Sequence, residues 1–224
     1  MKLVYINPNA TAGMTAGVVE SAQAAMPDVT VIGLTNSDGP AAIEGPDDGA
    51  AAVPGLLARL DAAEAQGADA IIIACFDDTG LAAARDKARC PVLGIGQSGY
   101  VMASLLGHRF SVVTSLAVSV PVIADNISAG GFAGNCASVR ASGLPVLTID
   151  AGGPETLARI ADEIELARVH DGATCAVLGC AGMSPLKDAL GRMTGMPLID
   201  GVAASAHLAV AAARFAAGAR RLAG

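Results

Sequence analysis

Two segments of the chain resemble each other, and each carries a cysteine at the same place. The first reads GADAIIIACFDDTG from Gly67, and the second reads GATCAVLGCAGMSP from Gly172. In both, the cysteine falls eight residues after the opening glycine, and a proline-led apolar segment follows about sixteen residues later, PVLGIG in one and PLIDG in the other. We therefore predict that Cys75 and Cys180 occupy equivalent strand ends in two copies of one unit.

Two thiols that face one cleft from opposite sides can carry out a particular proton transfer. A thiolate removes a proton from one face of a carbon, and the opposing thiol returns a proton to the other face, which is what a racemase without a cofactor needs. A helix is predicted to follow each cysteine within a few residues. Its free N–H groups and the positive end of its dipole should lower the thiol pKa from about 8.5 and favour the thiolate.

The alternative role for a cysteine is that of a small buried apolar residue. Matched positions in a repeat favour catalysis for Cys75 and Cys180, whereas Cys90, Cys136 and Cys175 are assigned the buried role. No His or Cys follows Cys180 at metal-ligand spacing, so we expect no metal site.

Short apolar runs alternate with alanine-rich amphipathic segments, a pattern typical of βα units that feed a parallel sheet. The predicted class is α/β, with two pseudo-symmetric flavodoxin-like domains, each a mainly parallel four-stranded sheet flanked by helices. The first domain would comprise residues 1–96 plus 202–224 and the second residues 97–201, with ligands in the cleft at the carboxyl ends of the strands. Strands are expected at 2–6, 29–33, 70–74, 92–95, 110–114, 136–140, 175–179 and 198–199, and helices at 11–25, 48–66, 81–87, 100–106, 119–129, 155–170, 185–193 and 202–217.

The segment GIGQSG from Gly94 matches the G-x-G-x-x-G pattern of dinucleotide-binding proteins. Such a site also needs an acidic residue about twenty positions later to bind the ribose, and none occurs between Gly96 and Ala124. We interpret these glycines as a turn between the two halves.

Two polar turns lie at predicted strand ends. Asn7-Pro8-Asn9 ends the first strand; it is either a capped turn or a ligand-binding turn that opens onto the cleft. Thr114 and Ser115 end the fifth strand, where their hydroxyls either cap the next helix or contact a ligand.

Net charge and cysteine content restrict which kinds of partner and which cellular compartment are expected. A net charge of −7, with no basic cluster beyond Arg220 and Arg221, argues against nucleic acid or an anionic membrane and favours a small molecule. The first apolar run is too short for a signal peptide, and the longest charge-free stretch, residues 90–107, is broken by Pro and Gly and is not a membrane span. Five cysteines without a secretory signal indicate reduced thiols in a cytoplasmic protein.

An ordered set of motifs resembles the aspartate/glutamate/hydantoin racemase superfamily, specifically its hydantoin and allantoin racemase branch. The set covers nearly the whole chain: INPNAT, AAIEGPDD, ACFDDTG, PVLGIG, FSVVTS, CASVRASGLPVL, LGCAGM and PLIDGV. The resemblance implies an active site between two α/β domains, no metal or organic cofactor, and often a homo-oligomer. It implies Cys75 and Cys180 as the catalytic pair, and its ligand contacts map onto Asn9, Phe76, Asp77, Asp78, Thr114, Ser115, Ala181, Gly182 and Met183.

The chain departs from the family pattern at three positions. Related sequences have C-F-G-D-P-G after the first cysteine, where this chain has Asp77 for Gly and Thr79 for Pro, and Val118 stands where an arginine is often found. A carboxylate at Asp77 should raise the pKa of Cys75, because a like charge opposes thiolate formation, or it could recruit a polar substrate group.

The sequence thus predicts racemisation at C5 of a 5-substituted hydantoin or an allantoin-like ureide by two-cysteine proton transfer. Maleate-isomerase-like chemistry, with one cysteine as a nucleophile, and amino-acid racemisation are alternatives on the same scaffold. Arylmalonate-decarboxylase-like chemistry fits less well, because it would leave Cys180 redundant. A different class is a non-catalytic protein that binds a small acid or amide in the cleft.

Overall fold

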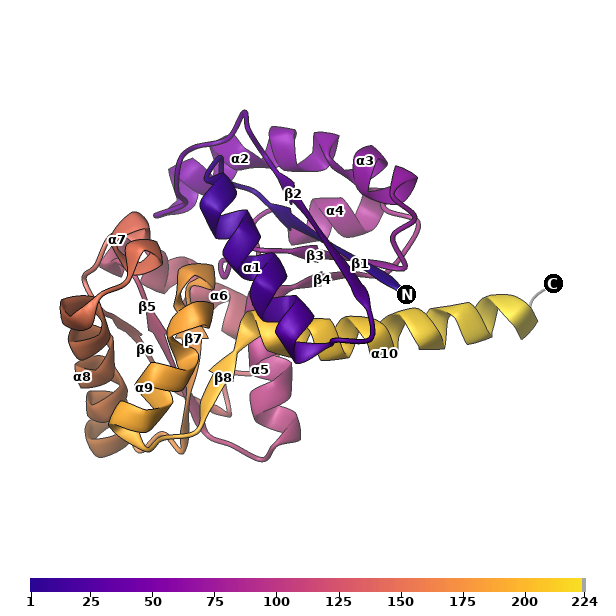
Figure 1. Ribbon diagram of the computed structural model, residues 1–224. Helices are drawn as coiled ribbons and strands as arrows, with labels where there is room; N and C mark the ends of the chain where they lie inside the picture. Colours follow the sequence, from indigo (N-terminus) through magenta and orange to yellow (C-terminus); the bar gives the residue numbers. More distant parts are fainter. Residues whose placement is uncertain (223–224) are drawn as a thin grey trace.

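The frame of the protein consists of two four-stranded sheets in which every strand pairing is parallel (Figure 1). The computed structural model describes residues 1–222, and side chains up to residue 218, so the side chains of Arg220 and Arg221 and residues 223–224 lie outside the described part. The strand orders are β2-β1-β3-β4 and β6-β5-β7-β8, so the two sheets have the same topology. The predicted α/β class with two four-stranded sheets is confirmed.

The first sheet contains β1 (Lys2–Asn7), β2 (Thr30–Thr35), β3 (Ala70–Ile73) and β4 (Val92–Gly94), with helices α1 (Ala12–Ala25), α2 (Pro46–Ala58), α3 (Leu60–Ala65), α4 (Leu81–Lys87) and α5 (Ile95–Leu105). The second contains β5 (Phe110–Thr114), β6 (Cys136–Ala141), β7 (Cys175–Gly179) and β8 (Leu198–Asp200). The helices that come after β5 in the chain are η1 (Ala117–Ser119), α6 (Val120–Ala129), α7 (Val146–Ala151), α8 (Pro154–His170), η2 (Ala181–Leu186), α9 (Lys187–Thr194) and α10 (Gly201–Leu222).

Apolar packing divides into one central and two outer layers. The strands β3, β5 and β7 are buried along their whole length, as expected for parallel strands covered on both faces. The central layer joins side chains of both sheets to α5 and α10, whereas separate clusters cover the outer face of each sheet. The division into residues 1–96 plus 202–224 and 97–201 stays a prediction, since this central core is continuous between the halves.

The glycines of GIGQSG do not form a turn between the halves, and that interpretation is wrong. Gly96 and Gly99 lie in the first turns of α5, where backbone and side chains of other elements approach closely. A Cβ on Gly96 would lie 2.2 Å from the Phe76 carbonyl oxygen, and one on Gly99 would lie 2.8 Å from a methyl carbon of Val177. Glycine is required here for close packing of the helix.

Two other expectations about helices need correction. The helix predicted at 48–66 is broken at Arg59, which ends α2 and whose guanidinium turns back to the Thr35 carbonyl and the Asp38 carboxylate. Helix α7 was not predicted, because it has six residues and its first free N–H, that of Val146, is bonded by Glu44 from the other half. Sequence periodicity cannot reveal a helix whose stabilising partner is 102 residues away.

Helix α10 is long and apolar enough, by length and composition, to cross a membrane over Gly201–Gly218. Its N-terminal part packs in the central core against α1 and α5, and 44% of that stretch is buried. Residues between Val202 and Ala213 thus contribute to the core, whereas Phe215 further along the helix is 83% exposed.

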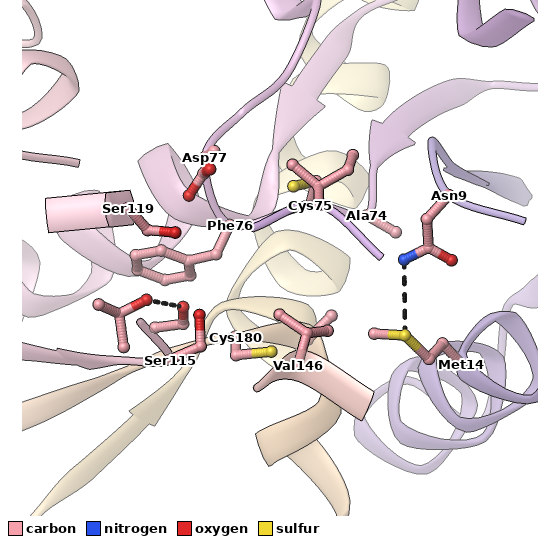
Figure 2. A pocket seen from close by; sticks show the side chains of 14 residues that line it. Asn9, Met14, Ala74, Cys75, Phe76, Asp77, Ser115, Ser119, Val146 and Cys180 are labelled. Carbon is pink, nitrogen blue, oxygen red and sulfur yellow. Dashed lines mark hydrogen bonds between the residues drawn. The ribbon is translucent and has the colours of Figure 1, made fainter. Parts of the chain in front are cut away.

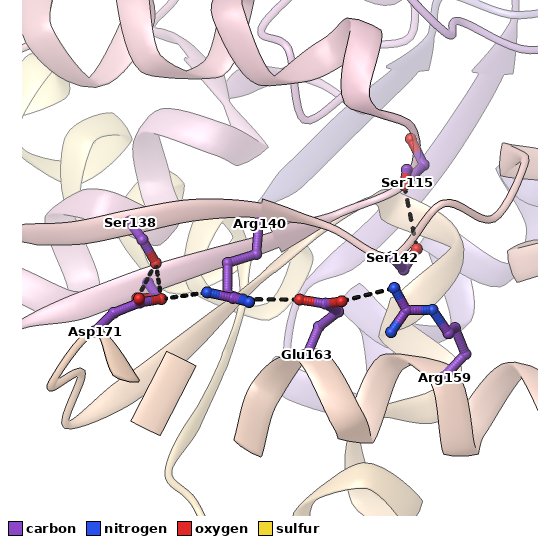
Figure 3. A network of polar contacts seen from close by, with 8 residues as sticks. Ser115, Ser138, Arg140, Ser142, Arg159, Glu163 and Asp171 are labelled. Carbon is purple, nitrogen blue, oxygen red and sulfur yellow. Dashed lines mark hydrogen bonds and ion pairs between the residues drawn. The ribbon is translucent and has the colours of Figure 1, made fainter. Parts of the chain in front are cut away.

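A charged network attaches α8 to the edge strand β6 (Figure 3). The Arg140 guanidinium donates to Glu163 at 2.8 Å and to Asp171 at 2.9 Å. Two residues further along the chain, the Ser142 hydroxyl donates to the Ser115 carbonyl at 3.2 Å. The edge strand therefore holds the polar turn that follows β5.

Candidate active site

Cys75 and Cys180 line one cavity at the carboxyl ends of β3 and β7 (Figure 2). In Figure 2 the two cysteines lie between Asn9 at one end and Asp77 at the other. The cavity measures about 30 Å³, which holds about two water molecules. A ring-shaped substrate therefore requires the cavity to widen.

The turn after Cys75 is held by its own backbone. The Asp77 N–H donates to Cys75 Sγ, and the Asp78 N–H donates to the Cys75 carbonyl at 3.0 Å. Asp78 has a positive φ of 51°, and the Thr79 hydroxyl points back to donate to Cys75 Sγ at 3.6 Å. Three consecutive residues therefore contact the one cysteine.

The turn after Cys180 repeats this arrangement. The Gly182 N–H donates to Cys180 Sγ, and the Met183 N–H donates to the Cys180 carbonyl at 3.0 Å. The donors occupy the same positions as in the first half, two and three residues after the cysteine. The sequence repeat therefore corresponds to a repeat of local geometry.

The thiols are not activated in this state, contrary to the expectation from helix dipoles. Burial, the largest effect, raises the pKa of Cys75 well above its ordinary value, and the Asp77 carboxylate raises it further, as predicted. Burial also raises the pKa of Cys180 to about 12, with added contributions from Asp77, Asp150 and Glu44. In this state burial therefore favours the thiol form of both cysteines, because the effect of desolvation on the pKa outweighs that of the N–H donors.

Asp78 anchors the Cys75 turn to α5 and does not line the cavity. Its carboxylate accepts hydrogen bonds from the Gly96 N–H at 3.0 Å and the Gln97 N–H at 2.7 Å. A Cβ on Gly94 would lie 1.9 Å from Asp78 Oδ1, so glycine leaves the space that the carboxylate fills. Burial nevertheless raises the pKa of Asp78 to about 7.

The Asn9 side chain is oriented by its neighbours. Its Oδ1 accepts hydrogen bonds from Asn7 Nδ2 and from the Thr11 N–H, both at 2.9 Å. Its Nδ2 donates to Met14 Sδ at 3.5 Å (Figure 2). The amide therefore presents its N–H side to the cavity.

The two hydroxyls after β5 differ. Thr114 Oγ1 donates to the Gly179 carbonyl at 2.8 Å and so ties β5 to β7. The carbonyl of Ser115 is held by Ser142 and Gly143, whereas within the described residues no hydrogen bond engages its hydroxyl. Of the two, only Ser115 offers an unengaged hydroxyl.

The structure places most of the predicted site residues together, while some lie outside the cavity. Lining it with the two cysteines are Asn9, Phe76, Asp77, Thr114, Ser115 and Ala181. Asp78, Gly182 and Met183 do not line it. Sequence reasoning missed Met14, Ile43, Ser119 and Val146, which also line it and come from other elements.

Ile43 belongs to the segment AAIEGPDD, which reaches from the first half to the second. The next residue, Glu44, accepts a hydrogen bond from the Val146 N–H at 2.7 Å through its Oε1. Ile43 and Val146 both line the cavity. The Glu44 contact therefore joins the two halves beside the site.

Metal binding finds no support in the residues present. Among residues 1–222, no group of three or more His, Cys, Asp or Glu is arranged to hold a metal ion. The polar groups of the cavity are thiols, hydroxyls, an amide and one carboxylate, the side chain of Asp77.

Two cysteines that line one cavity between repeated α/β units are the arrangement expected of a racemase. Comparison with known proteins identifies the family. Residues 3–209 match the family Asp/Glu/Hydantoin racemase. The chain is 48% identical over 212 residues to a hydantoin racemase of Rhizobium meliloti, covering 94% of this chain and 88% of that protein. It matches the crystal structure of allantoin racemase from Pseudomonas fluorescens with a TM-score of 0.91 and 34% identity, covering 96% and 92% of the two chains.

The chain belongs to the Asp/Glu/hydantoin racemase family, and it is a racemase. The resemblance to the hydantoin and allantoin branch is therefore confirmed. Unliganded arylmalonate decarboxylase shares the fold, with a TM-score of 0.64 and 19% identity over 95% of this chain and 92% of that one.

Proposed function

We propose that this racemase inverts C5 of a 5-substituted hydantoin or an allantoin-like ureide by proton transfer between Cys75 and Cys180. The observation that carries the proposal is that two cysteines in equivalent turns of the two halves line one cavity. The names of the hydantoin and allantoin racemases that the chain resembles support the substrate class.

The reaction needs one thiolate and one thiol. The thiolate takes the C5 proton and becomes a thiol, and the C–H electron pair moves into the adjacent carbonyl to form an enolate. The opposing thiol then gives its proton to the other face of C5 and is left as the thiolate. Because the two sulfurs have exchanged roles, the same site accepts either enantiomer.

The enolate oxygen needs hydrogen-bond donors, and we assign them to the residue directly after each cysteine. The N–H groups of Asp77 and Gly182 are already bonded to the sulfurs. Phe76 and Ala181 line the cavity, and their N–H groups donate to no acceptor within the described residues. One such donor, or the Asn9 amide, contributes roughly 3–4 kcal/mol to stabilising an oxyanion.

The charge of the cavity favours a neutral substrate over the alternatives. Its lining contains the Asp77 carboxylate and, among described residues, no Lys, Arg or His. Maleate, aspartate, glutamate and arylmalonate are anions, and a carboxylate in a poorly solvated wall repels them. A hydantoin or ureide carries no negative carboxylate and offers N–H groups.

The test is incubation in deuterated water with hydantoins, allantoin, aspartate and glutamate, followed by NMR of the exchanging carbon. We expect exchange and racemisation with the first two classes. Cys75→Ser and Cys180→Ser should each lower racemisation at least about a thousandfold, while exchange in one direction can persist. Cys90→Ser, outside the cavity, is the control.

Full racemisation by either cavity variant would refute the two-cysteine mechanism. A non-catalytic binding protein would be stabilised by the ligand without deuterium entering it. A covalent adduct in mass spectrometry would instead support maleate-isomerase-like chemistry.

We further propose, from the resemblance, that the enzyme is a cytoplasmic homo-oligomer. Light scattering of the purified protein, which measures its mass in solution, checks the oligomeric state.

A further inference from the structure

The Asp77 carboxylate is the one charged side chain in the wall of the cavity, within the described residues. Two other carboxylates, on Glu44 and Asp150, also raise the pKa of Cys180 through their charge. No Lys, Arg or His of the described chain lines the cavity to balance them. The cavity is therefore electrostatically suited to a cation or to N–H donors.

The backbone of Asp77 is fixed, whereas its carboxylate is not engaged. The Asp77 N–H donates to Cys75 Sγ, and its carbonyl accepts a hydrogen bond from Asn126 Nδ2 at 2.7 Å. Within the described residues, no ion pair or hydrogen bond reaches the carboxylate. The carboxylates of Asp78 and Glu44, by contrast, each accept backbone N–H groups.

Asp77 lies at the end of the site away from Asn9 (Figure 2). At the Asn9 end of the cavity, the amide of Asn9 offers an N–H donor, which suits a carbonyl of the substrate ring. Asp77 and the buried hydroxyl residue Ser119 both line the cavity and are drawn on the same side of it in Figure 2. With C5 between the two sulfurs, a group that projects away from the ring carbonyl meets Asp77.

We propose that Asp77 selects substrates whose C5 substituent carries N–H donors, such as a ureido group or a primary ammonium. This inference rests on the proposed function and deepens it. A half-buried carboxylate without a partner loses solvation when the cavity fills, and a donor on the substrate replaces the lost hydrogen bonds, whereas an apolar substituent does not.

The substituent also affects catalysis through Cys75. The charge of Asp77 opposes ionisation of that thiol. A bound ammonium offsets this charge and makes the thiolate easier to form. The preference should therefore appear in kcat as well as in KM.

Two matched pairs of substrates isolate the substituent. Allantoin and 5-isobutylhydantoin carry side groups of the same shape, and only the ureido group has N–H donors. 5-(3-Aminopropyl)hydantoin and 5-butylhydantoin have chains of equal length, and only the first carries a cation. Each kcat/KM is divided by the uncatalysed exchange rate of the same compound, which removes intrinsic differences in C5 acidity.

We expect wild type to favour the donor compound of each pair by about tenfold or more. Asp77→Leu, which keeps the side-chain shape without an acceptor, should reduce both ratios to about one. Asp77→Asn, which keeps an acceptor without charge, should abolish the preference for the cation and retain part of that for the ureide. Asp125→Asn, an exposed position on α6, is the control.

The inference would be overturned if, in wild type, the corrected kcat/KM values of the two compounds in each pair were about equal. It would also be overturned if the preference for the donor compound persisted in Asp77→Leu. The proposed function would stand in that case if exchange of the hydantoins still required both cysteines. A wild-type enzyme that exchanges none of the four compounds would overturn the two proposals together. Thermal unfolding of each variant shows whether it is folded.

Discussion

Asp77 and Gly182 occupy the same position in the two halves, and each donates its backbone N–H to the sulfur of the cysteine two residues before it. The backbone around the two sulfurs is therefore repeated, while the side chains differ. Glycine adds nothing to the second turn, whereas aspartate adds a carboxylate to the first. The two proton-transfer groups are alike in geometry and unlike in electrostatic environment.

The pH dependence of the rate should report this carboxylate. Both thiol pKa values are raised, so kcat/KM should still be rising with pH above neutrality. Asp77→Asn removes a negative charge beside Cys75, which lowers that pKa and shifts the rise toward lower pH by about one unit. Exchange rates between about pH 6 and pH 10, corrected for the uncatalysed reaction, measure the shift; superimposable profiles would contradict the coupling.

Asp77 should also make folding stability depend on pH. Burial raises the pKa of Asp77 from 3.8 to about 6, so the folded protein binds its proton more tightly than the unfolded chain does. The contribution of this proton to the free energy of unfolding is fully present below the unfolded pKa and is lost as pH rises through about 6. Asp77→Asn should be more stable than wild type at pH 8 by on the order of 2 kcal/mol, and the gain should shrink near pH 4. Urea unfolding at the two pH values tests this, and an equal gain at both would show that charge is not the cause.

Substitution of Gly96 should reveal the link between α5 and the Cys75 turn. In Gly96→Ala the new methyl would lie 2.2 Å from the Phe76 carbonyl oxygen, so the turn or the helix must move. We expect a loss of kcat of about a hundredfold, because displacements of about 1 Å in a site have effects of this size. Gly13→Ala, where nothing lies within 4 Å, is the matched control and should keep wild-type activity.

Glu44→Ala should weaken the contact that joins the halves beside the cavity. It removes the acceptor that holds the Val146 N–H at 2.7 Å and loosens the segment that carries Ile43. We expect KM to rise several-fold, which corresponds to the roughly 1 kcal/mol that a hydrogen bond contributes. The rise should be smaller in Glu44→Gln, because glutamine keeps an acceptor. Asp47→Ala, exposed in the same region, serves as the control, and an unchanged KM in Glu44→Ala would show that this contact does not affect substrate binding.

The sequence predicted those parts of the site that follow from local pattern. The repeat around Cys75 and Cys180 placed both cysteines at strand ends, because parallel strands with the same apolar run and the same following turn fold alike. Eight strands were predicted close to their observed bounds for the same reason. Asn9 was found because a polar turn after a first strand opens onto the same edge of the sheet.

The parts that sequence could not predict depend on contacts between distant segments. Ile43 and Val146 meet in the cavity because Glu44 bonds across 102 residues. The raised pKa values of the two cysteines could not be predicted, because a sequence pattern reveals the helix that follows each cysteine but not the depth of burial. The glycines of α5 were assigned to a turn because their role is to admit the Phe76 carbonyl and Val177.

Thr79 is the remaining departure from the family pattern beside Cys75, and its hydroxyl should assist catalysis. It donates to Cys75 Sγ at 3.6 Å and is the side-chain group that lowers the pKa of that thiol. Thr79→Val keeps the shape and removes the donor, so the thiolate becomes harder to form. A hydrogen bond to a charged group contributes about 1.5–3 kcal/mol, so kcat should fall by roughly tenfold or more.

Thr79→Ser, which restores the hydroxyl with one methyl fewer, should recover most of the rate. The pH at which the rate rises gives a second readout. Thr79→Val should move this pH upward and Asp77→Asn should move it downward, because the two changes shift the pKa of Cys75 in opposite directions. A Val variant that turns over at the wild-type rate, or a Ser variant as slow as Val, would assign Thr79 to packing of the turn. Opposite shifts in the two variants would show that Cys75 ionises under the combined control of one donor and one carboxylate.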